Sequence, residues 1–249
     1  MKRLPTELVA QAKHGRDFIL GVDLGQARDY TAICILERFE ELTGEAEKGR
    51  WVTRVRYEMP HLERPPLGTS YPQIIERLKG VLSQLPVHER VNSLVDWTGC
   101  GRPVVDLMRA EKLTVIPVTI TFSGTVSGGR LFGYTVPKRQ LVSNLAILLQ
   151  SDRLKIARTL PEAPAMIEEL QNFKIKFTRA GNETYEAWRE SDHDDLVLAA
   201  AMAAWFGEKK LWSILKLPPL PPAPVETRQP TLNEIIDMQP KRGPETRRI

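Results

Sequence analysis

The sequence predicts an α/β fold, in which a mixed sheet with an antiparallel three-strand meander and additional parallel strands is flanked by helices. Near the N-terminus, two apolar runs joined by a short polar turn are typical of a β-hairpin. An alternating apolar segment after the hairpin predicts a third antiparallel strand. In the middle of the chain, a strand pattern, a helix pattern and a second strand pattern follow one another, which indicates a parallel crossover.

The hairpin is predicted over residues 18–36, FILGVDLGQARDYTAICIL, and the third strand over residues 51–57. Asp23 is the unusual residue of this region, because it lies at the end of an apolar strand. A carboxylate in a central strand is costly to bury unless a partner compensates its charge, and a bound cation is one such partner. Asp23 is therefore the first candidate for a functional residue.

Helix and strand patterns alternate over the next part of the chain. Apolar residues at helical spacing predict an amphipathic helix over residues 71–85. The run VNSLVD at 91–96 predicts a short buried strand that ends on Asp96. Residues 102–111 then predict a helix and residues 113–120 a strand parallel to the previous one.

The later segments are shorter. Residues 121–135 are rich in Gly and Ser and predict either a mobile functional loop or a small hairpin. Pro137 is expected to be the first residue of a helix. Residues 154–157 predict a brief strand, residues 161–172 a helix, and the alternating FKIKF segment at 173–177 another strand.

The last predicted helix, DDLVLAAAMAAWF at 194–206, is apolar on nearly all sides and must be buried. Asp194 and Asp195 lie at its N-terminal end. Carboxyl ends of neighbouring strands converge on one edge of an α/β sheet, so Asp23 and Asp96 can share a site with this pair. Each acid alone also fits a capping role. As a set without His or Cys they indicate Mg²⁺ or Mn²⁺, and two such ions can support phosphodiester hydrolysis.

Composition bounds the remaining possibilities. A length of 249 residues with 42% hydrophobic residues predicts one main domain at 17–212, between an N-terminal arm at 1–16 and a Pro-rich linker with a disordered basic tail at 213–249. The net charge of +4 is a mild bias towards an anionic partner. Without an apolar run of membrane length or a signal peptide, we expect a cytoplasmic protein that uses no membrane, with Cys34 and Cys100 reduced.

Five blocks of this sequence also resemble a known family. In chain order they are GVDLGQARDYTAICILE, LVDWTGCGRPVVDLM, PKRQLVSNLAILLQSDRLKIA, ELQNFKIKFTRAGN and SDHDDLVLAAAMAAW. Together they resemble the nuclease domain of the large terminase subunit of tailed phages, which has an RNase H-like (RuvC-like) fold, over residues 18–206. The resemblance matches the family's strand acids to Asp23 and Asp96, and its H-D-D helix start to residues 193–195.

The resemblance implies a metal-dependent endonuclease that hydrolyses double-stranded DNA at two Mg²⁺ or Mn²⁺ ions during packaging, with little sequence specificity. Asp23, Asp96, Asp194 and Asp195 are the expected catalytic residues and metal ligands, while His193 is expected to be a turn or supporting residue. Basic side chains near the expected site are candidate contacts to DNA phosphates, with solvated surface charge as the alternative. They are Arg130, Lys138, Arg139, Lys174 and Lys176.

The sequence contains no G-x-x-x-x-G-K-[ST] phosphate loop, whereas a full terminase large subunit has an ATPase motor. We therefore expect a phage- or prophage-encoded partner of a separate terminase ATPase, a small terminase subunit or a portal. A split gene, a prophage remnant and a freestanding nuclease all fit this expectation.

Other functions remain open. The D-x-G at 23–25 and DWTGCG at 96–101 are also similar to phosphate loops of the sugar kinase, Hsp70 and actin superfamily, which binds ATP between two similar halves. A prophage-derived protein that binds DNA or a portal without cutting is another alternative. A RuvC-like junction resolvase is a third alternative, and it is more closely related to the expected nuclease than the other two.

Overall fold

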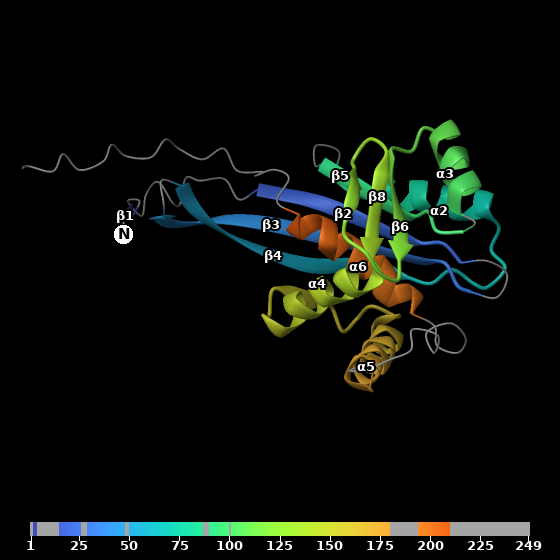
Figure 1. Ribbon diagram of the computed structural model, residues 1–249. Helices are drawn as coiled ribbons and strands as arrows, with labels where there is room; N and C mark the ends of the chain where they lie inside the picture. The colour runs from blue at the N-terminus through green and yellow to red at the C-terminus, as the bar shows by residue number, and fades with distance from the viewer. Residues whose placement is uncertain are drawn as a thin grey trace, which may run out of the picture. The chain divides into compact units, whose positions relative to one another are not determined.

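In the computed structural model, one mixed sheet runs through the described part of the chain (Figure 1). The structure describes residues 2–3, 15–25, 29–47, 50–86, 90–99, 101–179 and 194–209. Within these residues the sheet has nine strands, in the order β7-β8-β6-β5-β2-β3-β4-β9, with β1 (Lys2–Arg3) paired to β3. This confirms the predicted α/β class.

The predicted antiparallel meander consists of β2 (Gly15–Asp23), β3 (Ala32–Glu47) and β4 (Arg50–Glu63). Asp23 is paired with Ala32, so the hairpin closes beside the polar turn. β3 is longer than the sequence pattern indicates, because it continues through the charged residues after 36, with register shifts in its pairing to β4.

The parallel half of the sheet starts from β2. β5 (Arg90–Asp96) lies parallel to β2, β6 (Val115–Thr121) parallel to β5, and β8 (Gly133–Pro137) parallel to β6. β7 (Ser127–Gly129) pairs antiparallel with β8, so the Gly- and Ser-rich segment forms the small hairpin that was one of its two predicted structures.

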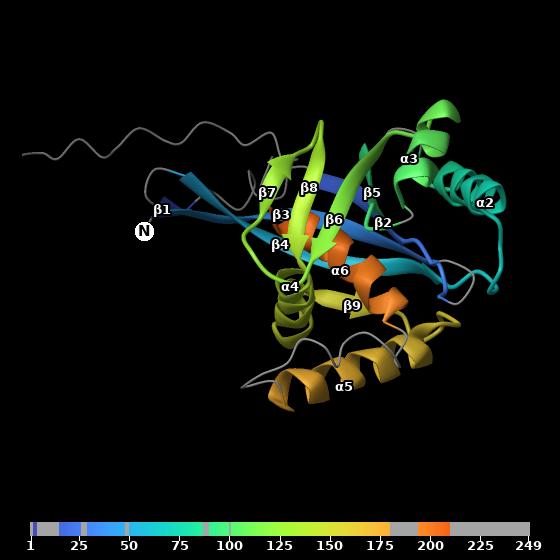
Figure 2. The same ribbon diagram turned by 45° about the vertical axis from the view of Figure 1, so that its right-hand side comes forward.

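Helices cover both faces of the sheet (Figures 1 and 2). α2 (Tyr71–Ser83) and α3 (Gly101–Ala110) pack on one face, where they share a hydrophobic core with β2, β3 and β5. α4 (Lys138–Gln150), α5 (Ala163–Arg179) and α6 (Asp195–Glu208) share the second core, on the other face. Each helix predicted within the described residues is present, with ends shifted by a few residues or, for α5, extended.

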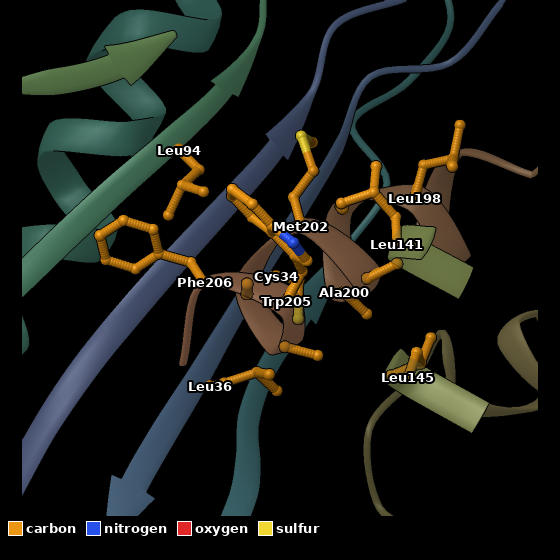
Figure 3. Close-up of a cluster of buried hydrophobic side chains, with 14 of the residues drawn as sticks. Cys34, Leu36, Leu94, Leu141, Leu145, Leu198, Ala200, Met202, Trp205 and Phe206 are labelled. Atoms are coloured by element: carbon orange, nitrogen blue, oxygen red, sulfur yellow. The ribbon is translucent and has the colours of Figure 1, made fainter. Parts of the chain in front are cut away.

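α6 is the central helix of its face, since every residue from its first to Gly207 is buried. In Figure 3 its side chains, including Met202 and Trp205, pack with residues of the neighbouring strands and of α4. The helix approaches β2 closely at Gly21, where an added Cβ would lie 2.0 Å from the Ala199 carbonyl oxygen. A glycine on β2 therefore lets α6 lie directly on the sheet.

The FKIKF segment is not a strand, contrary to the sequence-based prediction, because residues 173–177 continue α5. Its lysine and apolar residues alternate, but a longer window shows helical spacing, and five residues are too few to separate the two periods. The apolar positions of this window are Met166, Leu170, Phe173 and Phe177.

Smaller differences concern prolines. Pro137 is the last residue of β8 and precedes α4 instead of starting it. α5 begins at Ala163, two residues after Pro161. The brief strand is confirmed as β9 (Leu154–Ile156), which lies parallel to β4.

Several predictions fall on residues outside the described ranges, namely most of the N-terminal arm at 1–16, Cys100, His193 and the tail at 213–249. Cys34 is buried, and burial raises the pKa of its thiol well above the ordinary value. Among the described residues, no helix is both long enough and apolar enough to span a bilayer.

Candidate metal centre

Asp23 and Asp96 end two neighbouring parallel strands. Val22 of β2 pairs with Val95 of β5, so the following residue on each strand is an aspartate at the same edge of the sheet. Burial raises the pKa of Asp96, and hydrogen bonds to Thr98 and to the Asp23 side chain partly offset the rise. The two carboxyl groups therefore lie within hydrogen-bonding reach of each other.

The turn after β5 fixes Asp96. Its Oδ1 accepts hydrogen bonds from the Thr98 backbone N–H at 2.8 Å and from the Thr98 hydroxyl at 2.6 Å. The Thr98 Oγ1 in turn accepts the Ile120 N–H at 2.9 Å. α3 starts directly against this turn, since a Cβ at Gly101 would lie 2.3 Å from the Asp96 carbonyl oxygen. These contacts hold one carboxylate oxygen and restrict the side chain to one orientation.

The head of α6 brings the other two acids to the same edge. Asp194 is the N-cap residue and Asp195 the first helical residue, and Asp195 is only 7% exposed. Because α6 crosses β2 at Gly21, its N-terminus lies beside the end of that strand.

The pKa of Asp23 reports on this convergence. It lies well above the ordinary value because the group is buried and because the charges of Asp96, Asp195 and Asp194 are close, while Lys138 acts in the opposite direction. Burial also raises the pKa of Asp96, against its hydrogen bonds to Thr98. Asp96, Asp194 and Asp195 thus all lie within electrostatic range of Asp23.

Two basic side chains form ion pairs with the acids at the N-terminal end of α6. Lys138, the first residue of α4, places its Nζ 2.5 Å from Asp194 Oδ2. Arg64, the residue after β4, places its Nη2 3.6 Å from Asp195 Oδ2. Each of the paired aspartates is therefore contacted by a different basic side chain from a different element.

Glu169 is a site residue that the sequence did not reveal. It lies on α5, is 6% exposed, pairs with Arg64 and accepts the Val197 N–H of α6 at 3.1 Å. Burial raises the pKa of Glu169 to about 7. One sequence feature could have indicated Glu169. It lies three residues after the apolar Met166, which places an acid on the buried side of an amphipathic helix.

The donor set suits a hard divalent cation, since it consists of carboxylate oxygens and includes two acids within hydrogen-bonding reach of each other. Within the described ranges, no three His, Cys, Asp or Glu side chains lie close enough together to hold one ion. The carboxylates instead contact Lys138, Arg64 and one another.

The candidate DNA contacts lie in different places. Lys138 is at the acids, and Arg139 is exposed beside it in the first turn of α4. Arg130 donates a hydrogen bond at 2.6 Å to Asn92, which lies four residues before Asp96 on β5. Lys174 and Lys176 belong to α5, and their side chains are outside the described part of the structure.

These features define a class of protein. Five neighbouring strands of the sheet follow the order β4, β3, β2, β5 and β6, and only the pairs within the meander are antiparallel. Acids lie at the ends of the central strands β2 and β5 and at the N-terminal end of α6. This α/β arrangement is consistent with an RNase H-like fold. The described residues contain one such sheet, whereas the ATP-binding alternative requires two similar halves.

Sequence comparison gives the more particular relation. The chain is 25% identical over 186 residues to the terminase large subunit of Thermus virus P23-45, a match that covers 75% of this chain and 31% of that protein. The terminase large subunit of Thermus phage G20c matches with the same identity and coverage. No family model matches the chain. The similarity supports a terminase-related protein that spans about a third of the length of these relatives.

Proposed function

We propose that the chain is a metal-dependent DNA endonuclease that acts in phage DNA packaging. The observation that carries the proposal is the convergence of Asp23, Asp96, Asp194 and Asp195 on one edge of an RNase H-like sheet. The similarity to terminase large subunits supports the same function, since these proteins match the chain over most of its length.

The four aspartates are the proposed ligands of two Mg²⁺ or Mn²⁺ ions. Bound ions of this kind stabilise charge on a phosphodiester and supply a nucleophilic water at neutral pH. Within the chain, Thr98 orients Asp96, and Asp23 would have to be deprotonated to serve as a ligand. Lys138 neutralises part of the charge of Asp194, and it would be available to contact a DNA phosphate if a metal ion took its place.

The proposed substrate is the backbone of double-stranded DNA. Lys138 contacts Asp194 and Arg139 follows it on α4, while Arg130, Lys174 and Lys176 remain further proposed contacts. Phosphate contacts carry no base information, so little sequence preference is expected. A terminase ATPase, a small terminase subunit and a portal are the proposed partners.

Supercoiled plasmid is expected to be nicked and linearised in the presence of Mn²⁺ or Mg²⁺ and to stay intact in EDTA. The measurement is gel analysis of a supercoiled and a linear DNA over a range of metal concentrations. DNA binding without cleavage at any metal concentration would contradict the nuclease proposal and support the non-cutting alternative. Preferential cleavage of a four-way junction would indicate a resolvase.

Binding of Mn²⁺ is expected to become tighter as the pH rises. The pKa of Asp23 is raised in the metal-free protein by burial and by the neighbouring carboxylates, so a proton must leave before the ion can bind. Calorimetry between pH 6 and pH 8, in buffers of different ionisation enthalpy, measures both the affinity and the released proton. An affinity independent of pH, without proton release, would contradict Asp23 as a ligand.

A further inference from the structure

Glu169 caps α6, a role that the sequence left open for Asp194 as the alternative to metal binding. The first amides of a helix have no partner within the helix, and an N-cap Asp usually accepts one of them. Asp194 occupies the N-cap position of α6 but makes no capping hydrogen bond with its side chain. The Val197 N–H, in the first turn, is instead accepted by Glu169 Oε2 from α5. The Asp194 carboxylate pairs with Lys138.

Arg64 connects the same glutamate to the second acid of the pair. Its Nη2 contacts Glu169 Oε1 and lies 3.6 Å from Asp195 Oδ2, with 15% of the Arg64 side chain exposed. The guanidinium also lies 5.0 Å from the centre of the Tyr30 ring, which restrains it from another side. One buried ion pair therefore reaches both the backbone of α6 and the carboxylate of Asp195.

We infer that Glu169 and Arg64 are positioning residues of the metal site. Glu169 caps α6 from outside the helix, so that Asp194 can face the metal site, and Arg64 fixes the orientation of Asp195. The expected effect on metal binding rests on the proposed function, whereas the capping hydrogen bond is present in the metal-free protein.

The opposite end of α6 offers a matched control. Glu208, in the last turn, accepts hydrogen bonds from Arg153 at 2.7 and 2.9 Å and from the Tyr57 hydroxyl at 2.8 Å. This is also a partly buried Glu–Arg pair that anchors α6, but it lies about 20 Å from the acids along a helix of this length. Glu208→Gln removes the same charge as Glu169→Gln without touching the metal site.

Two measurements on these variants test the inference. Glu169→Gln is expected to weaken Mn²⁺ binding measured by calorimetry by at least ~10-fold, the usual effect of removing a partner of a metal ligand. In metal-free protein at pH 8, above the pKa of Glu169, amide hydrogen exchange at Val197 is expected to be roughly fivefold faster, because a neutral acceptor replaces a charged one. Glu208→Gln should change neither quantity.

Wild-type exchange at Val197 in Glu169→Gln would overturn the capping role. Equal Mn²⁺ affinities of Glu169→Gln, Glu208→Gln and wild type would overturn the positioning role. If wild-type protein binds no Mn²⁺ and cuts no DNA, the proposed function fails, and the exchange at Val197 still decides whether Glu169 caps α6.

Discussion

Asp23→Asn is expected to abolish metal-dependent DNA cleavage and to raise the thermal stability measured in EDTA. Asp23 is the acid whose pKa is raised by all three of the others, so its substitution removes the proposed ligand that lies closest to the rest of the set. We expect the cleavage rate to fall at least ~100-fold, since partners that merely support a ligand already cost 10–100-fold. Asp195→Asn is expected to have an effect of the same order.

The stability gain follows from the sign of the pKa shift. A buried carboxyl whose pKa is raised holds its proton more tightly in the folded than in the unfolded state. The free energy of unfolding of the metal-free protein therefore falls as the pH rises from the ordinary carboxyl pKa through the raised value. Asparagine carries no charge, and its amide can donate to Asp96 in place of the lost proton.

The expected gain at pH 8 is roughly 1 kcal/mol, or about 2–4 °C in Tm. The gain should shrink as the pH is lowered, because protonated Asp23 is no longer penalised. Asp106→Asn on α3 is the control, since Asp106 is exposed and pairs with Arg109 on its own helix. Full cleavage activity in Asp23→Asn, or a lower Tm in EDTA at pH 8, would contradict the assignment.

Gly21→Ala is expected to destabilise the fold by about 1–3 kcal/mol, the usual cost of overpacking a tight core. The new Cβ would lie 2.0 Å from the Ala199 carbonyl oxygen and 3.4 Å from the Ala203 Cβ. A backbone atom cannot rotate away, so α6 must move off the sheet. Because α6 carries Asp194 and Asp195, we expect cleavage to decrease together with Tm.

Gly80→Ala is the matched control. Gly80 lies within α2, where an added Cβ meets nothing within 4 Å, so alanine should stabilise the helix by up to about 1 kcal/mol. Thermal or urea unfolding of both variants measures the difference. A Gly21→Ala protein that is as stable and as active as wild type would show that α6 does not rest on β2 at this point.

The sequence predicted the parts of the fold that depend on local pattern. The hairpin at Asp23, the strand that ends on Asp96 and the buried helix at its two acids all lie where apolar periodicity placed them. The convergence of the acids was predictable too, because the carboxyl ends of adjacent parallel strands share an edge.

Other features depend on contacts between distant residues and had no local signal. Arg64 and Glu169 are 105 positions apart, and either residue alone is typical of a solvated surface. Their pairing with α6 depends on how α5 docks, which periodicity does not specify. The strand prediction for the FKIKF segment was wrong for a different reason. Five alternating residues were interpreted alone, although they continue the helical spacing of the residues before them.

The crossing of α6 over β2 has a consequence for the order of events during protein synthesis. β2 and β5, with their two acids, emerge from the ribosome early, whereas the residues that complete the site come after α5. A nascent chain therefore holds half of the proposed ligands until its last described helix is made and docks at Gly21. For the proposed nuclease, cleavage would then require nearly the whole described fold to be in place.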